Sequence, residues 1–285
     1  MSTISNTPGS NGPRKRKGAL IGGGIALAVV LAAGVTVAVV ASQNGGDDAP
    51  AEAEGYDLVT DGTLTIGTEG TYKPFTFHDE SGDLTGYDVE IATAVAEKLG
   101  LEVRFEETEW DGIFAGLEAG RFDVIANQVS INEERQAQYL LSEPYTVSPG
   151  VIIVSADNTD IQGFDDLEGK RAAQSATSNW YELSASYGAE IETVEGWNES
   201  IALLRDGRID YTLNDKLTFL DYVQTEGATD IKEVAETDDP SLNAFALAQG
   251  NDELLADIDA ALAELAADGT LAEIGVKYFG VDVSQ

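Results

Sequence analysis

Short apolar runs alternate with helical patterns from about residue 60 onwards, and this alternation restricts the fold more than any other feature. In the first block, the expected strands lie at residues 63–67, 103–105 and 124–126, and the expected helices at residues 89–99 and 113–117. Gly100 and Gly120 follow these helices and are typical of helix ends. Strands that alternate with helices predict an α/β fold with a mainly parallel sheet.

A second strand–helix block begins at residues 151–154. Its further strands are expected at residues 171–173, 191–194 and 209–213, with another at 244–248, and its helices near Asn179, Asn198 and Asp215. Residues 252–267 form the clearest amphipathic pattern in the chain, because their apolar side chains share one face. A shorter helix is expected from residue 271 toward residue 278.

The N-terminal part differs from these blocks. Residues 18–41 carry no charge and exceed the roughly 20 residues that a membrane-spanning helix needs. The basic cluster at the end of residues 1–17 places the N-terminus in the cytoplasm. We therefore interpret residues 18–41 as a transmembrane anchor or a long signal peptide. Both alternatives export the acidic, flexible linker at residues 42–55 and everything that follows.

Charge and residue usage exclude several kinds of function. All 51 Asp and Glu residues follow Gly46, whereas four of the 16 Lys and Arg residues precede it. Such an acidic surface repels nucleic acids, so we expect no nucleic-acid partner, and it favours a monomer. No cysteine is present, which excludes disulfides, thiolate nucleophiles and a lipid-anchor cysteine. His78 is the only histidine and is expected in an exposed loop, so no metal or cofactor is expected.

Residues 123–145 contain the strongest candidate for a binding site. A buried strand ends there in a polar turn, which is where open α/β sheets bind their ligands. Arg135 follows Ser130 and Asn132 by about one helical turn. A hydroxyl group, the free amides of a helix start and a guanidinium can therefore converge on one anion, such as a carboxylate. The alternative is that Arg135 is a solvated surface charge.

Four segments resemble one known family, the extracytoplasmic solute-binding proteins of polar amino-acid ABC transporters. The segments are residues 67–77, 84–100, 110–135 and 142–154, and weaker matches extend the resemblance to about residues 60–280. The family's fold is an α/β, two-lobed, periplasmic-binding-protein-like (type II) clamshell with two crossing hinge strands. The resemblance implies that an amino acid binds between the lobes and is delivered to a membrane permease and its ATPase.

The resemblance also implies lobe boundaries in this chain. The hinge strands are expected near residues 146–154 and 243–249. The first lobe would then comprise residues 56–147 and 249–285, and the second lobe residues 148–248.

Five residues match the family positions that bind the α-carboxylate and α-ammonium groups. Arg135 matches the arginine that binds the carboxylate, and Ser130 matches the hydroxyl residue beside it. A planar guanidinium can donate two parallel hydrogen bonds to a carboxylate, which lysine cannot do. Thr177 and Ser178 match the turn whose amides reach the carboxylate from the second lobe. Asp215 matches the acceptor of the α-ammonium, although it can also cap the following helix.

Aromatic and polar residues at other matching positions are expected to surround the ligand side chain. Tyr72 and Trp110 match the aromatic pair that encloses its apolar part, with core packing as the alternative. Glu69 follows a strand directly and matches a ligand-contacting acid, with solvation as the alternative. Gln174 matches a position that selects the side chain, and Asn214 one at the cleft edge.

Asn127 and Gln128 point to the cystine-binding branch of the family. Many relatives have glycine where this chain has Gln128, whereas the sequence at residues 127–129 resembles the cystine-binding proteins, as does that at residues 213–217. Glu69 can accept the distal ammonium of cystine, but it can equally favour a cationic amino acid.

Two other functions fit the same fold. A few members are dehydratases of prearomatic amino acids, and Glu69 would be their general acid, but no second acid–base candidate supports catalysis here. An anchored sensory receptor is the other alternative. Its cytoplasmic part would be residues 1–17, which is too short for a kinase or a coiled coil. We therefore expect a binding protein rather than an enzyme.

Overall fold

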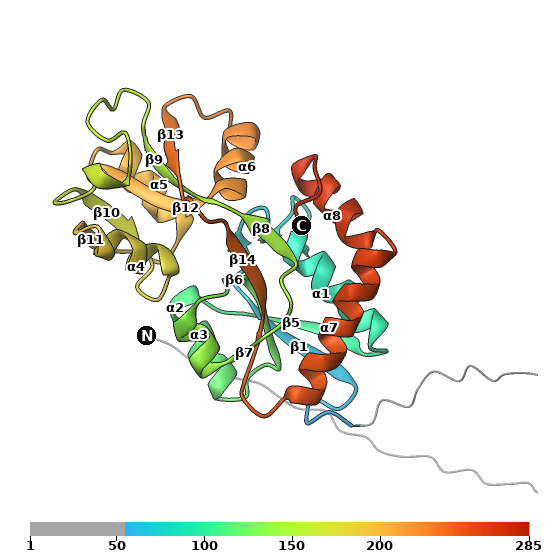
Figure 1. Ribbon diagram of the computed structural model, residues 1–285. Helices are drawn as coiled ribbons and strands as arrows, with labels where there is room; N and C mark the ends of the chain where they lie inside the picture. The colour runs from blue at the N-terminus through green and yellow to red at the C-terminus, as the bar shows by residue number, and fades with distance from the viewer. Residues whose placement is uncertain (1–54, 285) are drawn as a thin grey trace, which may run out of the picture. The chain divides into compact units, whose positions relative to one another are not determined.

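The computed structural model describes residues 55–284, which form two α/β lobes around two sheets (Figure 1). The expected anchor and the basic N-terminus, as well as the linker before Gly55, lie outside the described residues. Among residues 55–284, no helix combines the length and the apolar character needed to cross a membrane.

The first lobe is built on a six-stranded sheet with the order β5-β1-β6-β14-β7, and β8 pairs with β14. Its strands are β1 (Thr63–Thr68), β5 (Glu102–Glu107), β6 (Val124–Ser130), β7 (Leu140–Leu141), β8 (Thr146–Ser148) and β14 (Ser241–Leu247). Its helices are α1 (Tyr87–Lys98), α2 (Trp110–Glu118), α3 (Glu133–Gln138), α7 (Asp252–Ala267) and α8 (Thr270–Phe279). Helices α1, α7 and α8 pack together on one side of this sheet (Figure 1).

The second lobe is built on a five-stranded sheet with the order β11-β10-β12-β9-β13. Its strands are β9 (Gly150–Ser155), β10 (Arg171–Gln174), β11 (Glu190–Thr193), β12 (Tyr211–Asp215) and β13 (Ile231–Glu236). Its helices are η1 (Phe164–Asp166), α4 (Asn179–Ser186), α5 (Trp197–Arg205) and α6 (Lys216–Glu226). A small sheet of β2 (Thr71–Tyr72), β3 (Thr76–His78) and β4 (Leu84–Thr85), which the sequence did not predict, extends from the first lobe.

Each sheet has a parallel half and an antiparallel half. Strands β5, β1 and β6 are parallel, as are β11, β10 and β12, and all six were predicted from the strand–helix alternation. Strands β14 and β9 run antiparallel to their neighbours. The prediction of a mainly parallel sheet is therefore correct only for the strands joined by helices, since antiparallel neighbours need no crossover helix.

The chain crosses between the lobes at two neighbouring places. The first crossing lies between β8 and β9, within the expected residues 146–154. The second crossing lies between the end of β13 and the start of β14. The expected position, residues 243–249, is therefore wrong by several residues. Strand β14 pairs with β6 as far as Leu247 and Val124, so it belongs to the first sheet. Its apolar side chains are buried against β6 in the first lobe, a partnership that an apolar run alone does not reveal.

Candidate functional site

A cavity between the lobes brings together eight of the twelve predicted site residues. They come from both lobes and are Glu69, Tyr72, Trp110, Asn127, Gln128, Gln174, Ser178 and Asn214. Several of them lie at or just beyond the carboxyl ends of β1, β10 and β12, as expected for ligand sites in α/β sheets. The other four predicted residues, Ser130, Arg135, Thr177 and Asp215, do not line this cavity.

Six further residues of the second lobe line the cavity and were not predicted. They are Ser175, Asn179, Trp180, Gly196, Trp197 and Ser200. Together with Trp110, the two tryptophans make up all three of the chain's tryptophans. Trp180 and Trp197 lie at the starts of α4 and α5, directly after the loops that follow β10 and β11. A place after a strand is the sequence signal that predicted Glu69. Trp180 and Trp197 also follow strands, so the same signal points to them.

Arg135 is buried and has no carboxylate partner. Its side chain is 6% exposed, which excludes the alternative of a solvated surface charge. Nη1 donates to the backbone oxygen of Ser130 at 2.9 Å, and Nη2 lies 3.5 Å from the backbone oxygen of Thr177. No ion pair of Arg135 occurs among residues 55–284. Burial lowers the pKa of its guanidinium to about 10, although the charges of Glu182 and Glu134 act in the opposite direction.

Trp110 connects this cation to the cavity. The centre of its ring lies 5.3 Å from the guanidinium carbon of Arg135, and the ring of Phe114 lies at the same distance from that carbon. Trp110 also lines the cavity, and its buried Nε1 has no hydrogen-bond partner. The cation–π contacts therefore fix the orientation of Arg135 next to a residue of the cavity wall.

Asp215 belongs to the second lobe and is the last residue of β12. Ser148 Oγ and Leu217 N both donate to its Oδ1, at 2.6 and 2.8 Å, while no hydrogen bond to Oδ2 is present among the described residues. The bond from Leu217 confirms the predicted helix-capping role. Burial is the main cause that raises the pKa of Asp215, to about 6, because no cation compensates for the lost hydration.

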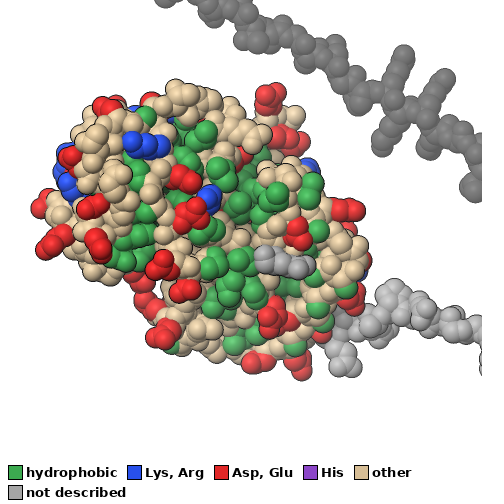
Figure 2. Space-filling view, turned by 45° about the horizontal axis from the view of Figure 1, so that its top comes forward, with side chains coloured by type: hydrophobic (Ala, Val, Ile, Leu, Met, Phe, Trp, Pro, Cys, Tyr) green, Lys and Arg blue, Asp and Glu red, His purple; other side chains and the backbone are tan. Residues whose placement is uncertain are grey.

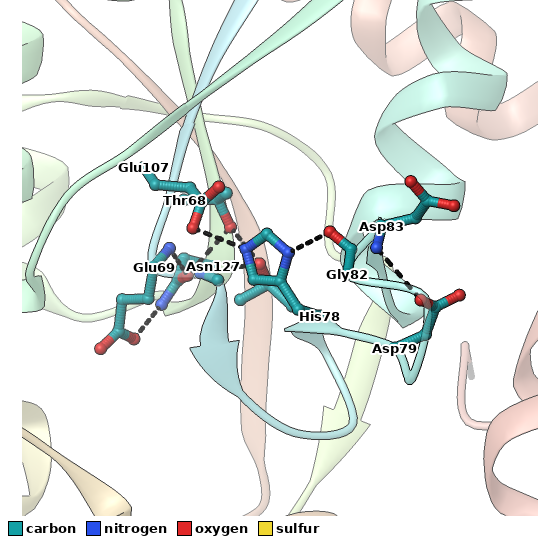
Figure 3. A network of polar contacts seen from close by, with 10 residues as sticks. Thr68, Glu69, His78, Asp79, Gly82, Asp83, Glu107 and Asn127 are labelled. Carbon is teal, nitrogen blue, oxygen red and sulfur yellow. Dashed lines mark hydrogen bonds and ion pairs between the residues drawn. The ribbon is translucent and has the colours of Figure 1, made fainter.

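Glu69 is held at the cavity by Asn127 (Figure 3). Asn127 Nδ2 donates to Glu69 Oε2 at 2.6 Å, and the Glu69 backbone N–H donates to Asn127 Oδ1 at 2.8 Å. Burial, together with the charge of Asp111, raises the pKa of Glu69 to about 7, although the Asn127 bond acts in the opposite direction. The charge of this carboxylate is therefore sensitive to pH near neutrality.

Gln128 has a left-handed backbone conformation, which is uncommon for a residue other than glycine. Its φ angle is 50°, in the left-handed region that favours glycine. Its backbone N–H donates to Asp88 Oδ2 at 2.6 Å, and its side-chain Nε2 donates to Asp88 Oδ1 at 2.7 Å. Nε2 also contacts Thr146 Oγ1 on β8 at 3.1 Å. Buried Asp88 therefore stabilises a strained residue between the cavity and a crossing strand.

The two lobes contact each other directly at the cavity. Tyr72 OH donates to Asn214 Oδ1 at 2.7 Å and accepts from Thr218 Oγ1 at 3.0 Å. Thr177 donates from both its backbone nitrogen and Oγ1 to Asp111 Oδ1, at 3.1 and 3.0 Å. Ser178 Oγ accepts from Tyr181 N and caps α4. Each inter-lobe bond needs the closed arrangement of the lobes.

His78 is exposed, as predicted, but it ends strand β3 instead of lying in a loop. Its ring nitrogens contact Glu107 Oε2 and the Gly82 backbone oxygen, both at 2.9 Å (Figure 3).

Comparison with known proteins agrees with the fold. Residues 64–281 match the model of bacterial extracellular solute-binding proteins, family 3. A probable amino-acid ABC transporter-binding protein of Haemophilus influenzae is 48% identical, covering 78% of this chain and 87% of the relative. The L-cystine-binding protein TcyA of Bacillus subtilis is 43% identical, covering 88% of this chain and 96% of the relative.

Solved structures agree with these relatives. An ancestral arginine-binding protein bound to arginine is 35% identical with a TM-score of 0.72, covering 77% of this chain and 99% of the other. The L-cystine solute receptor of Neisseria gonorrhoeae, unliganded and open, is 46% identical with a TM-score of 0.55, covering 78% and 94%. The more similar sequence has the lower structural score, as expected when the lobes of one structure are open and those of the other touch. The chain belongs to the bacterial extracellular solute-binding proteins, family 3.

Proposed function

We propose that this chain is the extracytoplasmic amino-acid-binding component of an ABC importer and captures its ligand by closure of the two lobes. The observation that carries the proposal is a pair of buried side chains of opposite charge, Arg135 on the first lobe and Asp215 on the second. Within residues 55–284, neither side chain forms an ion pair, although the charges of Glu182 and Glu134 act on Arg135, and Asp215 accepts hydrogen bonds at only one of its two oxygens. A ligand with both a carboxylate and an ammonium group can compensate both charges.

In this proposal, Arg135 and Ser130 bind the α-carboxylate with the amides of Thr177 and Ser178, and Asp215 binds the α-ammonium. Tyr72 and Trp110 enclose the apolar part of the ligand. Contacts to both lobes exist only after closure, so the ligand shifts the population of lobe arrangements toward the closed one.

Cystine is the favoured ligand. Relatives named for L-cystine binding include TcyA and the Neisseria receptor, at 43% and 46% identity. Glu69, supported by Asn127, Gln128, Gln174 and Asn214 around the same cavity, supplies negative charge for a second ammonium group. A cationic amino acid is the alternative ligand, because it also presents a distal positive charge.

The importer's permease and ATPase are the proposed partners. Residues 18–41 would anchor the protein or be removed during export, and N-terminal sequencing of the protein from its native cells distinguishes these two outcomes. Its strongly acidic surface favours a monomer (Figure 2).

Isothermal titration of the protein against the twenty amino acids and L-cystine tests the function. We expect tight binding of L-cystine and much weaker binding of the others. Tight binding of another amino acid would replace cystine and keep the proposed clamp. Absence of binding to every one of these compounds would overturn the proposed function.

A further inference from the structure

The ligand cavity continues outward into a groove along the edge of the cleft. Trp197 lines three spaces: the central cavity, an adjoining hollow that also includes Glu109 and Glu195, and an outer groove that also includes Lys73 and Asp221. Glu69 lines the central cavity and the adjoining hollow, while Thr71 and Asn198 line the adjoining hollow and the groove. The three spaces therefore share lining residues and lie next to one another.

One lysine distinguishes the outer groove from the acidic space before it. The adjoining hollow is lined by four glutamates, Glu69, Glu109, Glu195 and Glu199, and by no lysine or arginine. The outer groove contains Lys73, on the turn between β2 and β3, and Asp221, on α6 of the second lobe. Glu226 and His78 also line the outer groove, and Lys73 is its one lysine or arginine. A negatively charged group in the groove is attracted by Lys73 and repelled by the acids around it.

Neither charge is used by an internal ion pair. Within residues 55–284, no salt bridge involves Lys73 or Asp221. The ammonium of Lys73 lies 5.0 Å from the centre of the Phe77 ring, which holds it at the wall of the groove. Asp221 is half-buried. A positive and a negative group from opposite lobes thus face one groove without an ion pair between them, although the charge of Lys73 reaches Asp221 and opposes the rise of its pKa that burial causes.

We propose that this groove binds a second α-amino-acid head group, with Lys73 as the partner of its carboxylate. The ammonium of this second head group lies between Asp221 in the outer groove and Glu69 in the adjoining hollow. This inference rests on the proposed function, and it defines the substrate class as amino acids that carry two zwitterionic heads joined by a disulfide or thioether bridge. A simple cationic amino acid has no distal carboxylate and leaves Lys73 without a partner.

A comparison of two disulfides isolates the contact. L-Cystine has two complete heads, whereas the mixed disulfide of cysteine and cysteamine differs only by lacking the second carboxylate. We expect Lys73→Met to weaken L-cystine binding roughly fivefold or more, since it removes a charge-assisted contact. The same substitution should leave binding of the mixed disulfide within about twofold of its original value, and Lys73→Arg should restore most of the L-cystine affinity.

Lys98→Met is the matched control, because it removes the same charge from the first lobe at a lysine that pairs with Glu264 and Asp268. It should change neither affinity. If Lys73→Met lowers the affinity for both disulfides equally, Lys73 does not bind the second carboxylate and only balances the negative charge of the cleft. That result would overturn the proposed second head-group site and leave the proposed function intact. If the unaltered protein binds neither disulfide nor any amino acid, the proposed function fails and the groove assignment fails with it.

Discussion

The charged side chains that are proposed to bind the ligand are held mainly by neutral groups. Arg135 donates to backbone oxygens, Asp215 accepts from a serine and a backbone amide, and Glu69 is held by an asparagine. Hydrogen bonds from neutral groups orient a charge without cancelling it. The charges therefore remain available to a zwitterionic ligand.

Removal of the Arg135 guanidinium should cost most of the binding energy. We expect Arg135→Ala to weaken ligand binding by about 3–5 kcal/mol, because the bound carboxylate would be buried without a partner. Isothermal titration measures this loss. Arg121→Ala, at an exposed arginine of the same lobe, should bind normally. Near-normal affinity of the Arg135 variant would contradict its assignment as the carboxylate partner.

The affinity for a ligand with a distal ammonium should depend on pH through Glu69. The pKa of Glu69 is about 7 in the ligand-free site, and only its ionised form attracts a cation. Affinity should therefore decrease as the pH falls through 7, the range in which Glu69 takes up a proton while the ligand's ammonium groups stay charged. Dissociation constants measured between pH 5.5 and 8.5 by tryptophan fluorescence test this dependence. Glu69→Gln should flatten the profile, and an unchanged slope in that variant would assign the dependence to another group.

At the scale of elements, contacts between the helix starts of opposite lobes stabilise closure. Asp111 lies in the first turn of α2, and Thr177 lies in the turn before α4. Asp111 Oδ1 accepts two hydrogen bonds from Thr177 and has no place in the proposed ligand contacts. This pair is therefore expected to affect the affinity for every ligand by the same factor.

Asp111→Ala should weaken binding about tenfold, because each lost hydrogen bond is worth about 0.5–1.5 kcal/mol. Asp111→Asn keeps the accepting oxygen and should lose much less. Fluorescence titration at pH 8.5 separates this effect from that of Asp111 on the pKa of Glu69. The control is Glu109→Ala, which removes a neighbouring acid that makes no hydrogen bond to the second lobe within the described chain. An equal loss in that control would indicate a general charge effect instead.

For the whole molecule, buried acids and a formal net charge of −35 both lower stability at neutral pH. The pKa values of Asp88 and Asp215 are raised to about 6 by burial, compared with about 4 in an unfolded chain. Between these values the folded state binds more protons than the unfolded state. The free energy of unfolding therefore decreases as the pH rises through 4 to 6.

The melting temperature should consequently be higher at pH 5 than at pH 8, by roughly 5 °C or more. Thermal unfolding followed by circular dichroism tests this difference. Asp88→Asn should reduce it, and added salt should raise the melting temperature most at pH 8, where repulsion is greatest. A melting temperature that is highest at pH 8 in low salt would show that the burial of Asp88 and Asp215 does not determine how stability depends on pH.

The sequence by itself determined the strand–helix alternation, because this follows from local periodicity. It also determined the family, because whole segments match. Glu69, Gln174 and Asp215, which lie at or just after the ends of strands, were predicted from these two sources together. It did not determine that Trp180 and Trp197 share a cavity with Trp110, or that β14 belongs to the first sheet. Those features depend on which distant segments pack together, and a local pattern shows only that a side chain is buried, not against what. Tertiary structure also decided that Arg135 is buried and forms no ion pair within residues 55–284, because burial of a charge depends on which segments pack around it.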